Sequence, residues 1–522
     1  MKRKHTKLIC LGLALCLLTG LALGCGSSAN DTKTASAEVT AETTDQTMET
    51  TAAAAPDGTP PEGMGQPPER PDGNPPGGMG QPPERPDGTP SGGMPGGPGG
   101  MGQPPAGGPG GGPGGSSADI EYKGAVEITA ADSQSGQTYA SDTADESALL
   151  VSTGDAVTVD EPTVTKSGSS DGGDSCNFYG LNAAVLVKDG ADVTITGGTI
   201  TSDAMGANGV FCYGGNGGRN GAAGDGTTLT IRDTVITTTG GGSGGIMTTG
   251  GGVTYAYDLT VTTSGQSSAP IRTDRGGGTV YVDGGTYTSN GLGSPTIYST
   301  AEIHVSNATL TSNLSEGVCI EGKNSIELTN CDMTANNTKM NSNASFLDTI
   351  MIYQSMSGDA DSGTSAFIMT GGSLTSKSGH VFHVTNTSAV INLNNVTILN
   401  EDSQNILLSV CADGWSGASN VATLNASKQA LAGTILVGSD STLTLNLIDG
   451  SALIGTISGS ITNAKGEVVS TEVGTVDVTL DSTSTWVLTG DTYITSFTGE
   501  AANIVSNGYT LYVNGVALTG TK

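Results

Sequence analysis

A small set of charged and aromatic side chains stands out in a chain that has few of either. Of 522 residues, 20 are Lys or Arg and only 4% are aromatic. Members of the set recur about one repeat of the chain apart, after the apolar centre of a predicted strand: Arg272, Asp274, Tyr298, Glu321, Lys323 and Tyr353. Tyrosine rings offer flat apolar faces to sugars, and charged groups form strong hydrogen bonds with hydroxyls. If the fold places these residues on one face, we expect a carbohydrate-binding strip there.

Three residues of this region also allow a catalytic interpretation. A glycoside hydrolase uses two carboxyl groups at a fixed separation, and Asp274 and Glu321 are candidates. A polysaccharide lyase needs a basic group, for which Arg275 is available, among carboxylates that hold calcium. Carboxylates near Arg275 are few, so we favour binding over catalysis and keep a lyase or hydrolase as the alternative.

Metal-ligating residue types are scattered rather than clustered. The segment SGDADSG places Asp359 and Asp361 in a loop whose oxygens suit calcium, but the spacing is not that of an EF-hand. His380 and His383 lie three apart on a predicted strand, so we expect them to point to opposite faces. We therefore expect no cofactor, with calcium as the weak alternative.

The cysteines that follow the apolar N-terminal stretch, which itself holds Cys10 and Cys16, divide into two groups. Cys25 follows an apolar stretch and small residues (Ala22-Leu23-Gly24), whereas five others lie further on: Cys176, Cys212, Cys319, Cys331 and Cys411. An odd number cannot all pair in disulfides, so we expect buried thiols that fill the core.

A repeated phrase supplies the elements that must position these residues. Its copies include ADVTITGGTITSD at 191–203 and GTVYVDGGTYTSN at 278–290. The first inward residue of each copy recurs every 23 to 41 residues: Val157, Val193, Leu229, Thr254, Val280, Ile303, Ile326, Phe367 and Ile391. Apolar residues also stand two and seven positions later. The change from an even to an odd offset requires a corner between two short strands.

The fourth position of each copy fits such a corner. It is Gly, Asn or Asp in every copy except one, where Glu161 stands. These three residue types tolerate a left-handed backbone. A third strand follows, centred seventeen positions after the start at Ile271, Ile297 and Ile320, among others. Three short strands per coil predict a right-handed parallel β-helix.

This spacing also predicts a column of outward side chains, one per coil and about 4.8 Å apart. We expect its members to be Lys188, Phe211, Met247, Arg272, Tyr298, Glu321 and Tyr353. The next outward position gives a second column: Tyr213, Thr249, Asp274, Thr300 and Lys323.

The repeated phrases resemble those of pectate-lyase-like right-handed β-helix proteins, in particular adhesin-like bacterial surface proteins of that fold. The resemblance covers roughly residues 150–522. It implies an all-β solenoid and is weak for function, because this fold hosts lyases, hydrolases and adhesins alike. A structural spacer that binds nothing is a further alternative.

The N-terminal quarter is predicted to hold an export signal and a disordered linker. MKRKHTK and the apolar LICLGLALCLLTGLAL resemble a bacterial lipoprotein signal, which implies cleavage before Cys25 and lipidation of its thiol. We expect a signal peptide at 1–24, a disordered linker at 25–118, an N-terminal cap at 119–156, β-helix repeats at 157–420, and irregular coils with a cap at 421–522.

Charge narrows the possible partners. A net charge of −30 disfavours nucleic acid and acidic polymers. We expect an extracytoplasmic, lipid-anchored protein at the bacterial cell surface. It would contact the membrane through its anchor alone, bind a glycan or protein on a cell surface, and be a monomer.

Overall fold

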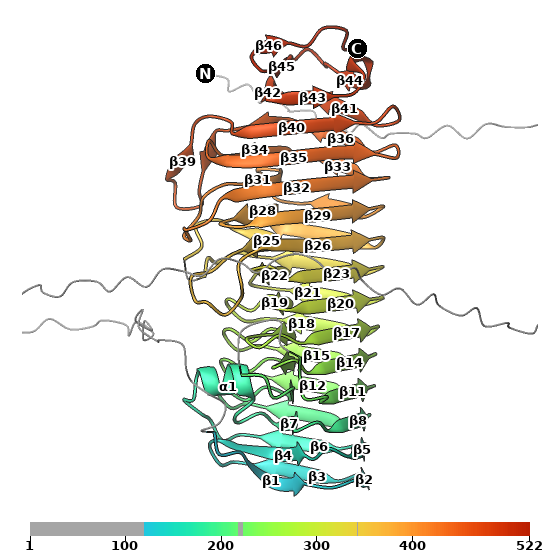
Figure 1. Ribbon diagram of the computed structural model, residues 1–522, viewed down its shortest axis with the longest axis vertical. Helices are drawn as coiled ribbons and strands as arrows, with labels where there is room; N and C mark the ends of the chain where they lie inside the picture. Colours follow the sequence, from blue (N-terminus) through green and yellow to red (C-terminus); the bar gives the residue numbers. More distant parts are fainter. Residues whose placement is uncertain (1–119, 218–222, 342) are drawn as a thin grey trace, which may run out of the picture. The chain divides into compact units, whose positions relative to one another are not determined.

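The computed structural model describes residues 120–217, 223–341 and 343–522. In this part the chain winds through three long parallel sheets, so that each turn adds one strand to each sheet in order (Figure 1). This confirms the right-handed parallel β-helix. The predicted signal peptide, Cys25 and the whole of the predicted linker lie outside the described residues.

Among the described residues, the first sheet, called sheet A, has thirteen strands. They are β1 (Lys123–Ile128), β4 (Glu146–Ser152), β7 (Val185–Lys188), β10 (Val210–Tyr213), β13 (Ile246–Thr249), β16 (Ile271–Thr273), β19 (Ile297–Ser299), β22 (Val318–Glu321), β25 (Asp348–Tyr353), β28 (His380–Thr385), β31 (Ile406–Val410), β34 (Thr434–Val437) and β37 (Ile457–Ser458).

Sheet B has fourteen described strands. They are β2 (Asp132–Ser135), β5 (Ala156–Asp160), β8 (Asp192–Thr196), β11 (Thr228–Arg232), β14 (Val253–Tyr257), β17 (Thr279–Asp283), β20 (Glu302–Ser306), β23 (Ser325–Thr329), β26 (Thr364–Thr370), β29 (Ser388–Asn394), β32 (Asn420–Ser427), β35 (Ser441–Ile448), β40 (Thr475–Leu480) and β43 (Ser496–Thr498).

Sheet C has ten described strands, and the four strands of sheet D follow it in sequence. Sheet C contains β3 (Thr138–Ser141), β6 (Thr163–Lys166), β9 (Thr199–Ser202), β12 (Val235–Thr238), β15 (Thr260–Thr263), β18 (Thr286–Ser289), β21 (Thr309–Ser312), β24 (Asp332–Asn336), β27 (Ser373–Ser378) and β30 (Thr397–Asn400). Sheet D contains β33 (Ala430–Ala432), β36 (Ala452–Gly455), β41 (Thr485–Leu488) and β44 (Ile504–Val505).

Short elements complete the described chain. A helix, α1 (Asp174–Tyr179), follows β6, and a 3-10 turn, η2 (Ala501–Asn503), precedes β44. Two small sheets lie near the C-terminus: β38 (Ile461–Thr462) with β39 (Val468–Ser470), and β42 (Thr492–Ile494) with β45 (Leu511–Val513) and β46 (Val516–Ala517). No helix of the described residues is long and apolar enough to cross a membrane.

The corner between sheets B and C forms where the sequence predicts it. The backbone is left-handed, with positive φ, at Gly197, Asp233, Asp258, Gly284, Asn307, Asn330, Gly371 and Asn395. Glu161, the exception in residue type, adopts the same conformation with φ of 49°. The corner geometry is therefore common to all nine coils, and the residue types follow from it.

One continuous core fills the interior of the coils. The residues two and seven positions after each repeat start, such as Ile195 and Ile200, are buried there, except Ile398, which is partly buried against the core. The five cysteines of the described region are buried, as expected, and form no disulfide in the structure. Stacking of coils thus provides the hydrophobic stability that a single thin coil lacks.

Candidate functional site

The candidate residues lie on the outer face of sheet A, but their register differs from the expected one. Arg272 pairs with Tyr298 as predicted, whereas Tyr298 pairs with Cys319 rather than Glu321. Cys319 in turn pairs with Met351, and Glu321 pairs with Tyr353. Lys323 follows β22 and lies outside both columns.

The cause of this difference is the length of one corner. Ten residues separate the inward Tyr287 from the inward Ile297, but only eight separate Leu310 from Val318. Because the difference is two residues, Val318 and Ile320 both face the core. The spacing of seventeen positions after the repeat start selects Ile320, whereas the residue that pairs with Ile297 is Val318. The same kind of error placed Lys188 beside Phe211, which pairs with Leu186.

A cavity of about 290 Å³ lies over this face, at the strands β16, β19, β22 and β25. Four residues of the predicted strip line it: Arg272, Tyr298, Glu321 and Tyr353. The cavity is also lined by residues that the sequence did not single out for this site, among them Glu316, Cys319, Met351 and Trp415. Asp274 and Lys323 do not line it. The structure therefore brings together four of the six predicted binding residues.

Glu321 organises the cavity wall by accepting hydrogen bonds on both carboxylate oxygens. Its Oε2 accepts from the hydroxyls of Tyr298 (2.6 Å) and Tyr353 (3.1 Å). Its Oε1 accepts from the hydroxyls of Ser355 and Ser357. Burial raises the pKa of both tyrosines well above 10, and the neighbouring Glu321 carboxylate adds to the effect, so both phenols remain donors. Because it holds both rings, Glu321 acts as a positioning residue.

Asp274 and Arg272 form a buried ion pair beside the cavity. Arg272 donates to Asp274 Oδ2 over 2.5 Å, and the backbone N–H of Arg275 donates to Asp274 Oδ1 over 3.0 Å. Asp274 is 3% exposed, and burial raises its pKa to about 6 although the guanidinium favours the charged form. The Arg272 guanidinium also lies 5.5 Å from the Tyr298 ring centre. Asp274 therefore orients Arg272 toward the cavity and has no free oxygen to offer a substrate.

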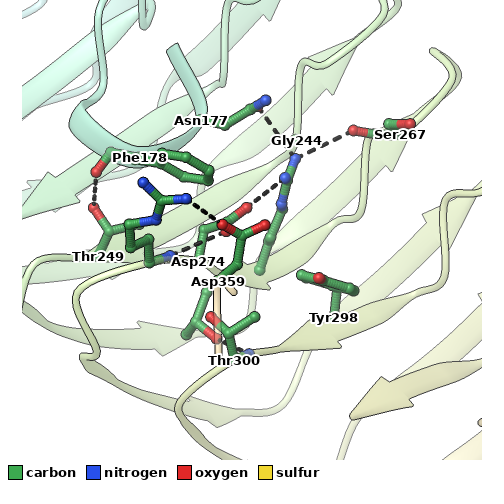
Figure 2. A network of polar contacts seen from close by, with 12 residues as sticks. Asn177, Phe178, Gly244, Thr249, Ser267, Asp274, Tyr298, Thr300 and Asp359 are labelled. Carbon is green, nitrogen blue, oxygen red and sulfur yellow. Dashed lines mark hydrogen bonds and ion pairs between the residues drawn. The ribbon is translucent and has the colours of Figure 1, made fainter. Parts of the chain in front are cut away.

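Arg275 ties a distant loop to the helix α1. Its guanidinium bonds to Asp359 over 2.5 Å and lies 4.3 Å from the centre of the Phe178 ring. Figure 2 shows Phe178, Asp274 and Asp359 around this network, with Tyr298 to one side. On the same loop, Asp361 pairs with Lys323 over 3.0 Å. Lys323 and Arg275 thus hold the cavity wall in place rather than form its floor.

These ion pairs bear on the weak calcium prediction. Asp359 and Asp361 each have a cationic partner, so their carboxylates are already neutralised. Among the described residues, no group of three or more His, Cys, Asp or Glu side chains could hold a metal ion.

Trp415 is an aromatic wall that the repeat pattern did not reveal. Its ring centre lies 4.9 Å from that of Tyr353, with the planes tilted by 55°. The loop that carries it is pinned by Asp413, which accepts hydrogen bonds from the backbone N–H groups of Ser345 and Gly414. The sequence offered one sign of it, a tryptophan in the Gly- and Ser-rich segment CADGWSG, where no inward strand position accounts for a large aromatic residue.

Beside this loop, His380 and His383 face the same side, contrary to the expectation. Both Nδ1 atoms lie 2.7 Å from the Ser409 hydroxyl, because the strand turns between them and places Val381 and Phe382 both in the core. His383 Nε2 is 3.3 Å from Asp413 Oδ2, without the alignment of a hydrogen bond. Burial alone would raise the pKa of Asp413, but His383 and Ser345 hold it below the usual value.

Comparisons with protein-family models, with curated proteins and with solved structures found no match to this chain.

Proposed function

We propose that this protein is a cell-surface lipoprotein that binds a neutral glycan in the sheet A cavity. The observation that carries the proposal is the cavity itself, in which Tyr298, Tyr353 and Trp415 stand beside Arg272. Ligand pockets combine apolar and aromatic walls with a few fixed polar groups. Aromatic walls can stack on the faces of sugar rings, and the guanidinium can bond to hydroxyls.

Charge supports a neutral sugar over an acidic one. The cavity contains the carboxyl groups of Glu316 and Glu321, and its one lining arginine is already paired with Asp274. The net charge of the chain is −30. An anionic polymer would meet repulsion both at a distance and within the cavity.

The contacts of the alternative catalytic residues favour binding over a lyase or hydrolase. Asp274 is held by Arg272, Arg275 is held by Asp359, and Glu321 accepts four hydroxyl hydrogen bonds. Each would have to give up partners before it could move a proton or attack a sugar. Release of reducing ends or unsaturated sugars from any polymer would contradict this proposal.

The binding proposal is tested with a glycan array and the purified full chain. We expect Trp415→Ala to weaken binding of any glycan hit by about tenfold or more, equivalent to at least about 1.4 kcal/mol. Tyr281→Ala is the matched control, because Tyr281 is 40% exposed on sheet B and does not line the cavity. Equal affinity of Trp415→Ala and the unmutated chain would contradict the proposal, as would a blank array, which would leave a protein ligand or a spacer role.

The proposed anchor is tested separately, since Cys25 lies outside the described residues. We expect lipid-labelled protein in the membrane fraction of a bacterial host, and loss of the label in Cys25→Ala. Retention of the label in that variant would contradict lipidation at Cys25.

A further inference from the structure

Two buried carboxyl groups lie level with each other beside the cavity, Asp348 at the start of β25 and Glu316 two residues before β22. Val318 of β22 pairs with Ile350 of β25, and Glu316 and Asp348 stand two positions before these partners. Glu316 is 6% exposed and Asp348 is 1% exposed. Among the described residues, neither has a Lys, Arg or His within ion-pair distance.

Other buried carboxylates of this face have a cationic partner or several hydroxyl donors. Asp274 has Arg272, Asp413 has His383, and Glu321 has four hydroxyl donors. By contrast, Glu316 accepts from neutral donors only, among them the Ser315 hydroxyl and its own backbone N–H, and Asp348 Oδ1 has no partner in the described structure. A buried carboxylate without a partner is costly, so the pair calls for a compensating charge.

Asn337, the residue directly after β24, contributes another oxygen without a partner. The Asn337 amide donates to the backbone carbonyl of Asp348 over 3.1 Å and lies within hydrogen-bonding reach of the Glu316 carboxyl. Asn337 is 1% exposed, and its Oδ1 has no partner among the described residues. Asp348 and Asn337 thus each have a buried oxygen without a partner, and both residues lie close to the Glu316 carboxyl.

The stacking distance of the β-helix matches the size of a cation. Residues level with each other on neighbouring strands lie about 4.8 Å apart. A calcium ion holds oxygens at about 2.3–2.6 Å, so an ion between two strands reaches a carboxylate on each. We propose that Glu316, Asp348 and Asn337 bind a hard divalent cation, with Ca²⁺ as the best fit. Oxygen-only donors select Ca²⁺ or Mg²⁺ over softer metals, and a set of several protein side chains favours Ca²⁺, because Mg²⁺ usually keeps several waters.

The electrostatics of the pair agree with this assignment. Burial raises the pKa of Asp348 well above its usual value, and the Glu316 carboxyl adds to the effect. Burial raises the pKa of Glu316 as well. Ca²⁺ binds carboxylates in their deprotonated form, so protons compete with the cation and binding weakens as the pH falls.

The three side chains leave part of the coordination shell open toward the cavity. Ca²⁺ takes six to eight oxygens, and these residues supply fewer. Glu316 lines the cavity, so water or the hydroxyls of a bound sugar would complete the shell. This second role rests on the proposed carbohydrate binding, whereas the cation site itself does not.

The site is tested without any glycan, by calorimetric titration of the full chain with CaCl₂ after chelation. We expect one Ca²⁺ per chain at this site at pH 7.5, with weaker binding at pH 5.5. Asp348→Asn should bind at least about tenfold more weakly, because a charged ligand is lost. It should also melt higher than the unmutated chain in EDTA, since an unpartnered buried acid is removed. Asp361→Asn is the matched control, and its Ca²⁺ affinity should be unchanged.

Three results would overturn the proposal: no binding heat and no Ca²⁺-dependent rise in Tm, unchanged affinity in Asp348→Asn, or loss of binding in Asp361→Asn. If Asp348→Asn does not fold, Glu316→Gln provides the same test. Ca²⁺ binding with a blank glycan array would retain the cation site and reject the carbohydrate function. Glycan binding that does not depend on Ca²⁺, in a chain that binds no Ca²⁺, would support the carbohydrate function and reject the cation site.

Discussion

Glu321 offers the sharpest test of how the cavity is held together. In Glu321→Ala the hydroxyls of Tyr298, Tyr353, Ser355 and Ser357 all lose their acceptor. A hydrogen bond to a charged group contributes about 1.5–3 kcal/mol, but water entering the cavity will replace part of four such bonds. We therefore expect a loss of about 3–5 kcal/mol in the free energy of local opening.

Glu321→Gln is the conservative comparison. The amide can place its oxygen toward the two tyrosines and its N–H₂ toward the two serines, whose hydroxyls can turn and accept. All four contacts survive as neutral hydrogen bonds, so we expect a smaller loss of about 1–3 kcal/mol. The order of stability is then the unmutated chain, Glu321→Gln, and Glu321→Ala.

Hydrogen–deuterium exchange suits this test better than global unfolding. Stacked coils open locally, so a single unfolding midpoint does not report on one strand. Peptides that cover β22 and β25 should exchange faster in the order given, while peptides from β35 should be unchanged. Unchanged exchange in Glu321→Ala would refute the assignment of Glu321 as the positioning residue, as would faster exchange in Glu321→Gln than in Glu321→Ala.

Three further predictions follow from the fold. Gly372→Ala should cost roughly 1–3 kcal/mol more than Gly450→Ala in urea unfolding. Both have positive φ, but only the Gly372 Cβ would meet the carbonyl of Cys331, at 2.1 Å; equal costs would contradict the close stacking of corners. His380 should destabilise the protein in acid. Burial, together with the adjacent His383, lowers the pKa of His380 from 6.5 to about 3, against the opposing effect of Asp402 and Asp413. The unfolded chain therefore binds a proton that the folded chain does not, and stability is lost as the pH falls from 6.5 toward 3. His380→Gln should lose less stability than the unmutated chain between pH 6.5 and pH 4, by up to about 3 kcal/mol, as measured by urea unfolding; parallel curves would show that His380 is not the group responsible. Finally, the five buried cysteines should resist alkylation in the native protein and react after unfolding, as read peptide by peptide with mass spectrometry. Rapid native labelling of Cys319 would show that the cavity floor is open.

The repeat pattern predicted the coil well because two local rules decide it. Inward apolar residues and a left-handed corner recur in each copy, and the corner is so strongly required that even Glu161 adopts it. Neither rule fixes the length of the corner between sheets C and A. The two-residue shortening before Val318 preserves the inward pattern, so the sequence contains no local sign that Cys319 replaces Glu321 in the column.

The repeat pattern could not predict the contacts between loops, for a different reason. Arg275 and Asp359 lie 84 residues apart and belong to no repeated position. Trp415 approaches Tyr353 from another such loop. Periodicity describes what the coils share, whereas these contacts depend on segments that occur once.

The position of the site follows from where the repeat is interrupted. The 41 residues from Ile326 to Phe367 exceed the shortest repeats by 18, and they carry Asn337, Ser355 and Asp359. The long first repeat supplies α1, and the stretch between the paired residues Ile391 and Leu424 supplies Trp415. Without these insertions the outer face of sheet A would be a plain ladder of side chains. The insertions cover it, and the shortened corner places Glu321 level with Tyr353 and offset from Tyr298, where one carboxylate oxygen accepts from both hydroxyls. A regular coil supplies the floor, and the departures from regularity supply the walls that make a binding site possible.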